Sequence, residues 1–255
     1  MEIKHISSAE NEYIKKIIKL KNKKYREMYG LFVAEGERSA KDALCSGFSV
    51  DAVIMTDAFY EKGAEAFAEC QIITTTESVF GKLCDTKTPQ GVLAVVAFPA
   101  EKKALSGKKY IYCDCVQDPG NAGTIIRSCD AFGFDGVIFS KGSVDAFSPK
   151  VIRSSMGAVF HIPVITEADD AFLQEAKENG YFLSVTALHK ESVPLKEGHY
   201  QPMQIFVIGN EGNGVSDAVL SMADEVLHIP MPGNAESLNA GVAASILMYE
   251  VSCYD

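Results

Sequence analysis

The sequence has no hydrophobic run long enough to cross a membrane, and its N-terminus is unlike a secretory signal. No stretch approaches the roughly 18 uninterrupted apolar residues that a membrane-spanning helix requires. The first residues, MEIKHISSAENEYIKK, are polar and lack the apolar middle of a signal peptide. Internal repeats and low-complexity tracts are also absent. We therefore expect a cytoplasmic protein with no membrane partner.

Cysteine occurs seven times, but never at the spacing of a metal site. Cys113 and Cys115 form a C-x-C pair, which on a strand places both side chains on one face. Packing as small hydrophobic side chains is favoured there, with metal binding as the alternative. The others are scattered along the chain: Cys45, Cys70, Cys84, Cys129 and Cys253. An odd number of thiols in a reducing compartment predicts reduced cysteines, and we expect no bound metal.

The composition predicts a folded chain of one large domain or two ordinary ones. Hydrophobic residues make up 47% of the 255 positions, and the mean hydropathy is +0.04. Residues 99–109, PAEKKALSGKK, are polar, contain Pro and Gly, and interrupt the hydrophobic periodicity. We place a linker there, between a small α/β domain at 1–98 and a second domain at 110–255.

Positive charge is concentrated near the N-terminus, although the net charge is -10. Residues 1–30 hold 8 basic and 4 acidic side chains, and the remainder holds 16 basic and 30 acidic ones, a balance of -14. Either this is a surface that binds RNA phosphates, or it is a solvated Lys-rich face of a helix predicted at about 10–22. The candidates for RNA contact are Lys15, Lys19, Lys23, Lys24 and Arg26.

From residue 110 onward, β-like runs alternate with helical segments. This alternation predicts an α/β fold with a mostly parallel sheet and helices on both faces. The runs cover 110–116, 136–139, the neighbourhood of 164, 181–185, 204–208 and 225–229, and the intervening helices are about 122–132, 150–158, 169–180, 215–223 and 237–254.

Three segments of this second domain, 111–133, 205–216 and 227–250, each lead from an apolar strand into a loop rich in Gly, Asn or Pro. Ligands of parallel sheets bind outside the carboxyl ends of the strands, where loops expose backbone groups. Three such loops from three strands predict one composite pocket.

In the first loop, Asn121 lies between Gly120 and Gly123, and Arg127 follows six residues later on a predicted helix. Asn121 is free to face a ligand, and the guanidinium of Arg127 is suited to bidentate phosphate binding. The alternative is structural: Asn121 caps the helix and Arg127 pairs with a surface acid.

The second and third loops differ in chemistry. GNEGNG, residues 209–214, resembles a phosphate-binding loop but lacks the lysine of a P-loop and the G-x-G-x-x-G spacing. A glutamate at its centre, Glu211, suits amines or hydroxyls better than phosphate. In IPMPG, residues 229–233, two prolines fix an irregular loop whose backbone groups are left free for a ligand. Ser237 and Asn239 are expected in the first turn of the next helix. A cap explains Ser237, whereas Asn239 suggests function.

Taken together, these segments resemble the three motifs of the SpoU (TrmH-type) RNA 2′-O-ribose methyltransferases of the SPOUT superfamily. The match covers about residues 108–255 and rests on N-x-G-x-I-x-R-x-x-x-x-F-G, I-G-N-E-G-x-G and I-P-M-x-G-x-x-x-S-L-N. The N-terminal part, with ISSAENEYIKKIIKLKNKKYRE, GLFVAEGERSAKDAL and TPQGVLAVV, resembles the substrate-binding domain often fused to them, a small ribosomal-protein-type RNA-binding fold.

The resemblance implies a deep trefoil knot, a homodimer formed through the C-terminal domain, and S-adenosylmethionine as the cofactor, without a metal. The implied catalytic residues are Asn121, Arg127, Glu211, Ser237 and Asn239. The implied cofactor-binding residues are Thr186, Ala187, Gly209, Asn210, Gly214, Ile229, Met231, Ser237 and Leu238. One departure is that Ala240 and Gly241 stand where the family often has Val-Ser.

The predicted function is methylation of a ribose 2′-hydroxyl in RNA, with ribosomal RNA favoured over transfer RNA. We expect Arg127 to anchor the neighbouring phosphate and stabilise the forming alkoxide, and Asn121 to position the ribose. The alternatives are a catalytically inactive RNA-binding protein of the same fold and a nucleotide-binding enzyme that uses GNEGNG for phosphates.

Overall fold

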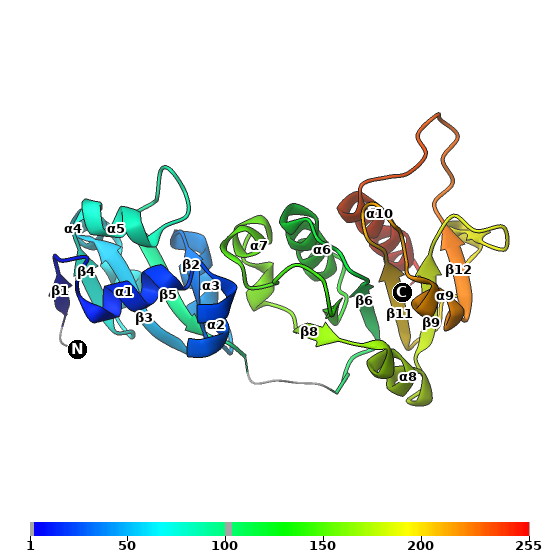
Figure 1. The fold of residues 1–255 in the computed structure, drawn as a ribbon, viewed down its shortest axis with the longest axis horizontal. Coiled ribbons are helices and arrows are strands. Elements are labelled where there is room, and N and C mark those ends of the chain that lie inside the picture. The colour runs from blue at the N-terminus through cyan, green and yellow to red at the C-terminus, as the bar shows by residue number, and fades with distance from the viewer. Residues whose placement is uncertain (1–2, 100–103, 255) are drawn as a thin grey trace. The chain divides into compact units, whose positions relative to one another are not determined.

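The computed structural model of the chain describes residues 3–99 and 104–254 (Figure 1). Contacts divide the chain into two compact units. Residues 1–100 and Phe147–His161 form the first unit, and residues 101–146 and 162–255 form the second. The segment Phe147–His161, which we predicted within the second domain, thus packs with the first unit. Part of the predicted linker, 100–103, lies outside the described residues, and the domain limits at 98 and 110 stay predictions.

A mixed five-stranded sheet with the order β1-β4-β3-β5-β2 forms the centre of the first unit. The pairs β1–β4 and β4–β3 are parallel, whereas β3–β5 and β5–β2 are antiparallel. The strands are β1 (Lys4–Ile6), β2 (Leu31–Glu35), β3 (Val50–Thr56), β4 (Ile72–Thr75) and β5 (Val92–Ala97). The helices are α1 (Glu12–Lys19), α2 (Lys23–Tyr29), α3 (Glu37–Cys45), α4 (Asp57–Gly63), α5 (Glu77–Leu83) and α7 (Pro149–Ser154).

Phe32 on β2 shows why the segment Phe147–His161 belongs to the first unit. Its ring is fully buried and lies 5.0 Å from the ring of Phe147 and 6.1 Å from that of Phe160 (centroid distances). Phe48 and Phe98 complete the cluster at 6.2 Å and 5.8 Å. Residues from the middle of the chain therefore supply two of the five rings of this core.

The second unit is built on a seven-stranded sheet with the order β10-β12-β9-β11-β6-β7-β8, in which every pair is parallel. This confirms the predicted α/β fold with a mostly parallel sheet flanked by helices. The strands are β6 (Lys109–Cys113), β7 (Gly136–Ser140), β8 (Val164–Ala168), β9 (Phe182–Thr186), β10 (Val193–Pro194), β11 (Gln204–Ile208) and β12 (Glu225–His228). The helices are α6 (Pro119–Ala131), α8 (Asp170–Glu178), α9 (Asp217–Ser221) and α10 (Ala240–Ser252).

Two helices near the predicted site begin at other residues than we predicted. Helix α6 begins at Pro119 rather than near 122, and α10 begins at Ala240 rather than at 237. Helix α2 and the short strands β1 and β10 were not predicted. None of the helices in the described ranges is both long and apolar enough to span a membrane. The trefoil knot stays a prediction.

Candidate active site

Four strands of the second unit end side by side. β12, β9, β11 and β6 are consecutive neighbours in the parallel sheet, with Ile208 at the end of β11 opposite Cys113 at the end of β6. Because the strands are parallel, the segments that follow them leave the same edge of the sheet. The loops predicted to form one pocket do therefore start at one edge.

Glu211 ties the loop after β11 to the loop after β6. Its carboxylate accepts hydrogen bonds from the backbone N–H groups of Gln117 and Asp118, both at 3.1 Å, and from the side-chain amide of Asn121 at 2.8 Å. We call these four residues the Glu211 latch. Asn121 is 6% exposed, so its amide is held in one orientation.

The charge of Glu211 is stabilised by this arrangement. Burial raises the pKa of its carboxyl, but the hydrogen bonds from Asn121 and from the backbone N–H groups outweigh it and hold the pKa below 4.5. Glu211 is thus ionised at neutral pH with its oxygens occupied by donors, which describes a positioning residue and not a proton acceptor.

Asn210 shapes the GNEGNG turn from within. Its Oδ1 accepts from the N–H groups of Gly212 at 2.9 Å and Asn213 at 3.0 Å, and its Nδ2 donates to the carbonyl of Cys115 at 2.8 Å. A backbone bridge joins Asn210 to Gly214. A Cβ on Gly209 would lie 2.3 Å from the backbone of Gly214, so only glycine permits this closure.

Asp114 and Asp118, which we did not predict as site residues, complete the junction of the two loops. Buried Asp114 accepts from the N–H of Ser216 at 2.7 Å, which fixes the far end of the β11 loop. Asp118 caps α6 by accepting from the N–H of Asn121 at 2.9 Å. An aspartate directly before Pro119 is a recognised helix start, and that signal could have found Asp118.

Asn121 therefore does not cap the helix, and the structural alternative for this residue is wrong. It lies in the first turn of α6, and its side chain points to Glu211 instead. Arg127, on the same helix, is exposed, and across the described residues its guanidinium makes no hydrogen bond or ion pair. The alternative that Arg127 pairs with a surface acid is also wrong, because the group is available for a ligand.

The amino end of α10 packs against α6 close to Arg127. Ser128 and Ser245 join the two helices through their hydroxyls at 2.7 Å. A Cβ on Gly241 would lie 3.1 Å from Cβ of Thr124 and 3.3 Å from Oδ1 of Asn239. The glycine at the position that departs from the family pattern thus leaves room for Thr124.

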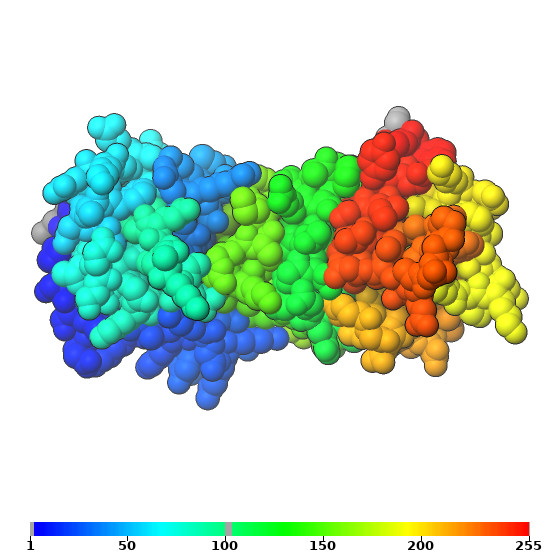
Figure 2. All heavy atoms as spheres, turned by 90° about the horizontal axis from the view of Figure 1, so that it is seen from above, coloured from blue at the N-terminus to red at the C-terminus, as the bar shows by residue number. Residues whose placement is uncertain are grey.

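The loop between β12 and α10 contrasts with the GNEGNG turn. From 230 to 238, its backbone makes no hydrogen bond to any other described residue. Ser237 and Leu238 are exposed, and Figure 2 shows this segment in orange at the surface. Asn239 is the N-cap of α10 and accepts from the N–H of Val242 at 3.2 Å. Our assignment of both Ser237 and Asn239 to the first turn, with Ser237 as the cap, is therefore wrong.

The remaining predicted cofactor residues lie at the same edge. Thr186 ends β9 and donates its hydroxyl to the carbonyl of Val207 at 2.7 Å, while the N–H of Ala187 donates to the carbonyl of Leu227 at 3.0 Å. Ile229 and Met231 follow β12 and are half-buried. The structure brings Asn121 and Glu211 together through a hydrogen bond, and in the described part of the chain neither of them is hydrogen-bonded to Ser237 or Asn239.

The predicted RNA-contact residues of the first unit behave in two ways. Lys15 pairs with Glu10 at 2.9 Å and Lys23 with Glu27 at 3.6 Å, while Lys19 and Lys24 are exposed. Arg26 is only 3% exposed, so its prediction as an RNA contact is wrong. Its guanidinium donates to two carbonyls at the end of α1, those of Leu20 at 2.7 Å and Lys21 at 2.9 Å.

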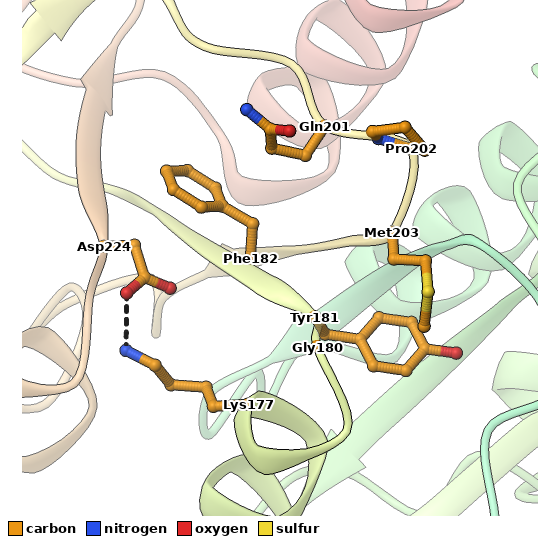
Figure 3. Close-up of a pocket in the computed structure, with 8 residues that line it drawn as sticks. All are labelled: Lys177, Gly180, Tyr181, Phe182, Gln201, Pro202, Met203 and Asp224. Carbon is orange, nitrogen blue, oxygen red and sulfur yellow. Dashed lines mark hydrogen bonds and ion pairs between the residues drawn. The ribbon is translucent and has the colours of Figure 1, made fainter.

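A shallow depression of the second unit lies elsewhere (Figure 3). Its lining includes Phe182 at the start of β9 and Met203 just before β11. Lys177 and Asp224 form an ion pair at its side, 2.8 Å apart. These residues precede the strands, whereas the candidate site follows them, so the depression is not part of the site.

Comparison with known proteins identifies the family. Residues 108–249 match the model of the SpoU rRNA Methylase family, and residues 11–94 match an MRM3-like substrate binding domain. The chain belongs to the SpoU rRNA methylase family. This confirms the predicted family and the predicted RNA methyltransferase class, and the Glu211 latch lies within the residues that match the methylase model.

Relatives of the full chain are known as well. The 23S rRNA (guanosine(2553)-2′-O)-methyltransferase RlmP of Bacillus subtilis is 38% identical over 250 residues, which cover 98% of this chain and 99% of the relative. The AdoMet-bound rRNA methyltransferase of Sinorhizobium meliloti is 28% identical with a TM-score of 0.89, covering 99% of this chain and 98% of the other. The SpoU methyltransferase AviRb of Streptomyces viridochromogenes, in complex with AdoMet, is 26% identical with a TM-score of 0.87, covering 96% and 98%. These complexes agree with the predicted cofactor.

Proposed function

We propose that this SpoU family member transfers the methyl group of S-adenosylmethionine to the ribose 2′-hydroxyl of a guanosine in 23S rRNA. The observation that carries the chemistry is the Glu211 latch, which holds Asn121 in place on the helix that also presents the exposed guanidinium of Arg127. The substrate follows the Bacillus subtilis relative, which this chain matches over 98% of its length. We place the reaction in the cytoplasm as part of this proposal.

The chain offers suitable groups for the cofactor. The backbone of residues 230–238 makes no hydrogen bond to the rest of the described chain. The side chain of Leu238, at the end of this segment, is 37% exposed. Such a loop can donate to and accept from a polar ligand while its prolines keep it open. The residues that would hold the cofactor are Thr186, Ala187, Gly209, Asn210, Gly214, Ile229, Met231, Ser237 and Leu238. When bound, S-adenosylmethionine supplies a methyl group that its positive sulfonium already activates.

The residues of the chain would then mainly align and stabilise. Asn121, fixed by Glu211, positions the ribose, and Arg127 anchors the adjacent phosphate and stabilises the negative charge that develops on the 2′-oxygen. A guanidinium stays protonated in proteins and therefore does not serve as a base. Asn239 keeps the start of α10 in place as its N-cap, and Ser237 lies in the open loop beside it.

We also propose that the protein is a homodimer formed through α10. Val242, Ile246 and Tyr249 recur at helical spacing and are 46%, 37% and 58% exposed, which leaves an apolar face of this helix uncovered in one copy. Leu238 extends this face toward the open loop. A second copy would bury these side chains and bring the loop into the interface. Sedimentation should show a dimer, and Ile246→Lys should shift it to a monomer.

The decisive experiment incubates the purified chain with S-adenosylmethionine and a 23S rRNA transcript, and maps ribose methylation by resistance to alkaline cleavage. One methylated guanosine is expected, and methylation of transfer RNA alone would contradict the substrate. Arg127→Ala should lose turnover without losing stability, because the exposed side chain has no partner among the described residues. Arg127→Lys is the matched control, since lysine keeps the positive charge but lacks the planar guanidinium that can donate two parallel hydrogen bonds to a phosphate. Turnover by Arg127→Ala close to that of the wild type would overturn this role.

A further inference from the structure

The first unit carries a group of tyrosine and lysine side chains that the proposed active site does not use. Tyr25 and Tyr29 lie one turn apart on α2, with ring centroids 6.1 Å apart and ring planes inclined by 19°. Nζ of Lys19 lies 5.5 Å from the ring centroid of Tyr25, and Nζ of Lys16 lies 5.3 Å from that of Tyr29. We call these four residues the tyrosine–lysine cluster.

The cluster is held by the fold. Helix α1 is anchored in the core by Ile14 and Ile17, both fully buried. Arg26, on the same helix as the tyrosines, donates to the carbonyls of Leu20 and Lys21 and so ties α2 to the end of α1. The lysines of one helix are thereby set over the rings of the other before any ligand arrives.

Both tyrosines are half-buried, but they differ in what they pack against. Tyr29 packs against the hydrophobic core of the first unit, whereas Tyr25 is not among the residues that pack against this core. Met28, between them in sequence, is 64% exposed, and Lys24 is exposed on the same short helix. Helix α2 therefore adds an exposed thioether and a further ammonium group to the rings and ammonium groups of the cluster.

We propose that the tyrosine–lysine cluster binds an unpaired nucleotide of RNA, with the base stacked on Tyr25 and Lys19 moved onto a flanking phosphate. A base stacked on an aromatic ring is held more strongly than an exposed ammonium over the same ring. The ammonium of Lys19, once displaced from the ring, pairs with a phosphate of the RNA. Replacing the ammonium by the base therefore favours RNA binding. A base in a duplex is already stacked and paired, so the cluster selects single-stranded or bulged segments. The choice of RNA as the partner rests on the proposed function.

The first test measures binding of three fluorescent RNA probes to the full chain by anisotropy: a 12-nucleotide oligoadenylate, an abasic strand of about the same length, and a duplex. Wild type and Tyr25→Phe, which keeps the ring, should bind the oligoadenylate more tightly than the other two. Tyr25→Leu should lose between about 5-fold and about 100-fold in affinity for the oligoadenylate alone. Lys24→Gln should weaken all three and lower the salt slope for single strands by about 0.7.

A second test uses the absence of tryptophan from the chain. Tyr25→Trp introduces a single indole at the proposed stacking position, and Tyr60→Trp introduces one at another half-buried tyrosine of the same unit, on α4. Oligoadenylate should quench the fluorescence of Tyr25→Trp and leave that of Tyr60→Trp unchanged. The abasic strand should quench neither.

Three results would overturn the proposal: equal binding of oligoadenylate by folded Tyr25→Leu and wild type, equal binding of all three probes by wild type, or no base-dependent quenching of Tyr25→Trp. If Tyr25→Leu does not fold, the quenching decides. None of these measurements involves methyl transfer. A wild-type chain that fails to methylate 23S rRNA would therefore contradict the proposed substrate without changing their outcome.

Discussion

Two loops at the same edge of the parallel sheet, 209–216 and 229–239, have similar compositions and opposite structures. Both follow strands of the parallel sheet and contain glycine, asparagine and serine. In the first, Asn210 and Glu211 bond to the turn itself and to the neighbouring loop. In the second, the backbone from 230 to 238 makes no hydrogen bond to another described residue. Glycine-rich sequence therefore does not by itself indicate a flexible loop.

The difference suggests a division of labour. The loop 209–216 already has its hydrogen bonds in the chain without a ligand. It can therefore hold Asn121 at a fixed place, as alignment of the reacting groups requires. The loop 229–239 keeps its polar groups available, so its order has to come from the cofactor and from a second copy. Changes in the first loop should thus affect stability and turnover together, and changes in the second should affect cofactor binding and dimer formation.

The largest effect is expected for Glu211→Ala, measured as turnover on a 23S rRNA transcript. Removing the carboxylate leaves the N–H groups of Gln117 and Asp118 and the amide of Asn121 without their acceptor. With Asn121 free to turn, turnover should fall about 100-fold, equivalent to about 2.7 kcal/mol in the barrier. A Glu211→Ala enzyme with wild-type turnover would mean that the latch does not position the ribose.

Glu211→Gln separates charge from shape. Glutamine keeps one acceptor oxygen but points a donor at the remaining N–H groups. Because the pKa of Glu211 is lowered in the folded chain, the carboxylate stabilises the fold above its unfolded pKa near 4.5, and this contribution is lost as the pH falls through the folded value. The difference in melting temperature between wild type and Glu211→Gln should be full at pH 7 and shrink below about pH 4.5. A difference independent of pH would argue against an ionised latch.

A smaller effect, on stability, is expected for Gly209→Ala. The new Cβ would lie 2.3 Å from the carbonyl carbon of Gly214, so the turn has to open. Overpacking of this kind costs about 2 kcal/mol, or a fall in melting temperature of roughly 4–8 °C. Gly212→Ala is the matched control, because its nearest neighbour is a side-chain oxygen at 3.6 Å. Equal melting temperatures for both variants would show that the closure is not required.

The two loops also show how much of the fold and of the site the sequence predicts. Most of the strands and helices in the second unit follow from hydrophobic alternation, and the three motifs lead to one edge of the sheet. The role of Glu211 does not follow, because its partners lie about ninety positions away and are brought close only by the pairing of β11 with β6. Nothing local in the sequence marks Asn239 over Ser237 as the cap, since both residue types cap helices.

Contacts between residues far apart in the sequence explain most of the other differences between our predictions and the structure. Arg26 lies among exposed lysines in the sequence, and only the turn between α1 and α2 shows that its guanidinium closes a helix end. Helix α2 itself has too few apolar positions for a periodic signal. The segment Phe147–His161 lies between strands of the second unit in sequence, yet its rings pack on Phe32 of the first.

A smaller change tests the junction of α6 and α10, which links the two loops. Gly241→Ser would place its Cβ 3.1 Å from Thr124, so the helices have to part slightly. We expect a loss of about 1 kcal/mol in the free energy of unfolding, measured by urea denaturation. Thr124→Ala should restore part of it, because it removes Cγ2, which lies 3.2 Å from the new Cβ, while the Cβ of residue 124 remains. If the double variant is no more stable than Gly241→Ser, the cost arises elsewhere.

The smallest effect on stability is expected in the open loop. A Cβ on Gly233 would meet no described atom within 4 Å, and Leu238 is exposed, so Gly233→Ala and Leu238→Ala should change the free energy of unfolding by less than about 0.5 kcal/mol. Leu238→Ala should nevertheless weaken S-adenosylmethionine binding, measured by calorimetry, because Leu238 lies in the loop proposed to hold it.

Hydrogen exchange gives the matching view of the backbone. Amides of 231–239 should exchange freely in the apo chain and slow when the cofactor binds, whereas those of 210–214 should be protected from the start. Protection of both loops in the apo chain would remove the contrast between them, and with it the reason to assign cofactor ordering to the second.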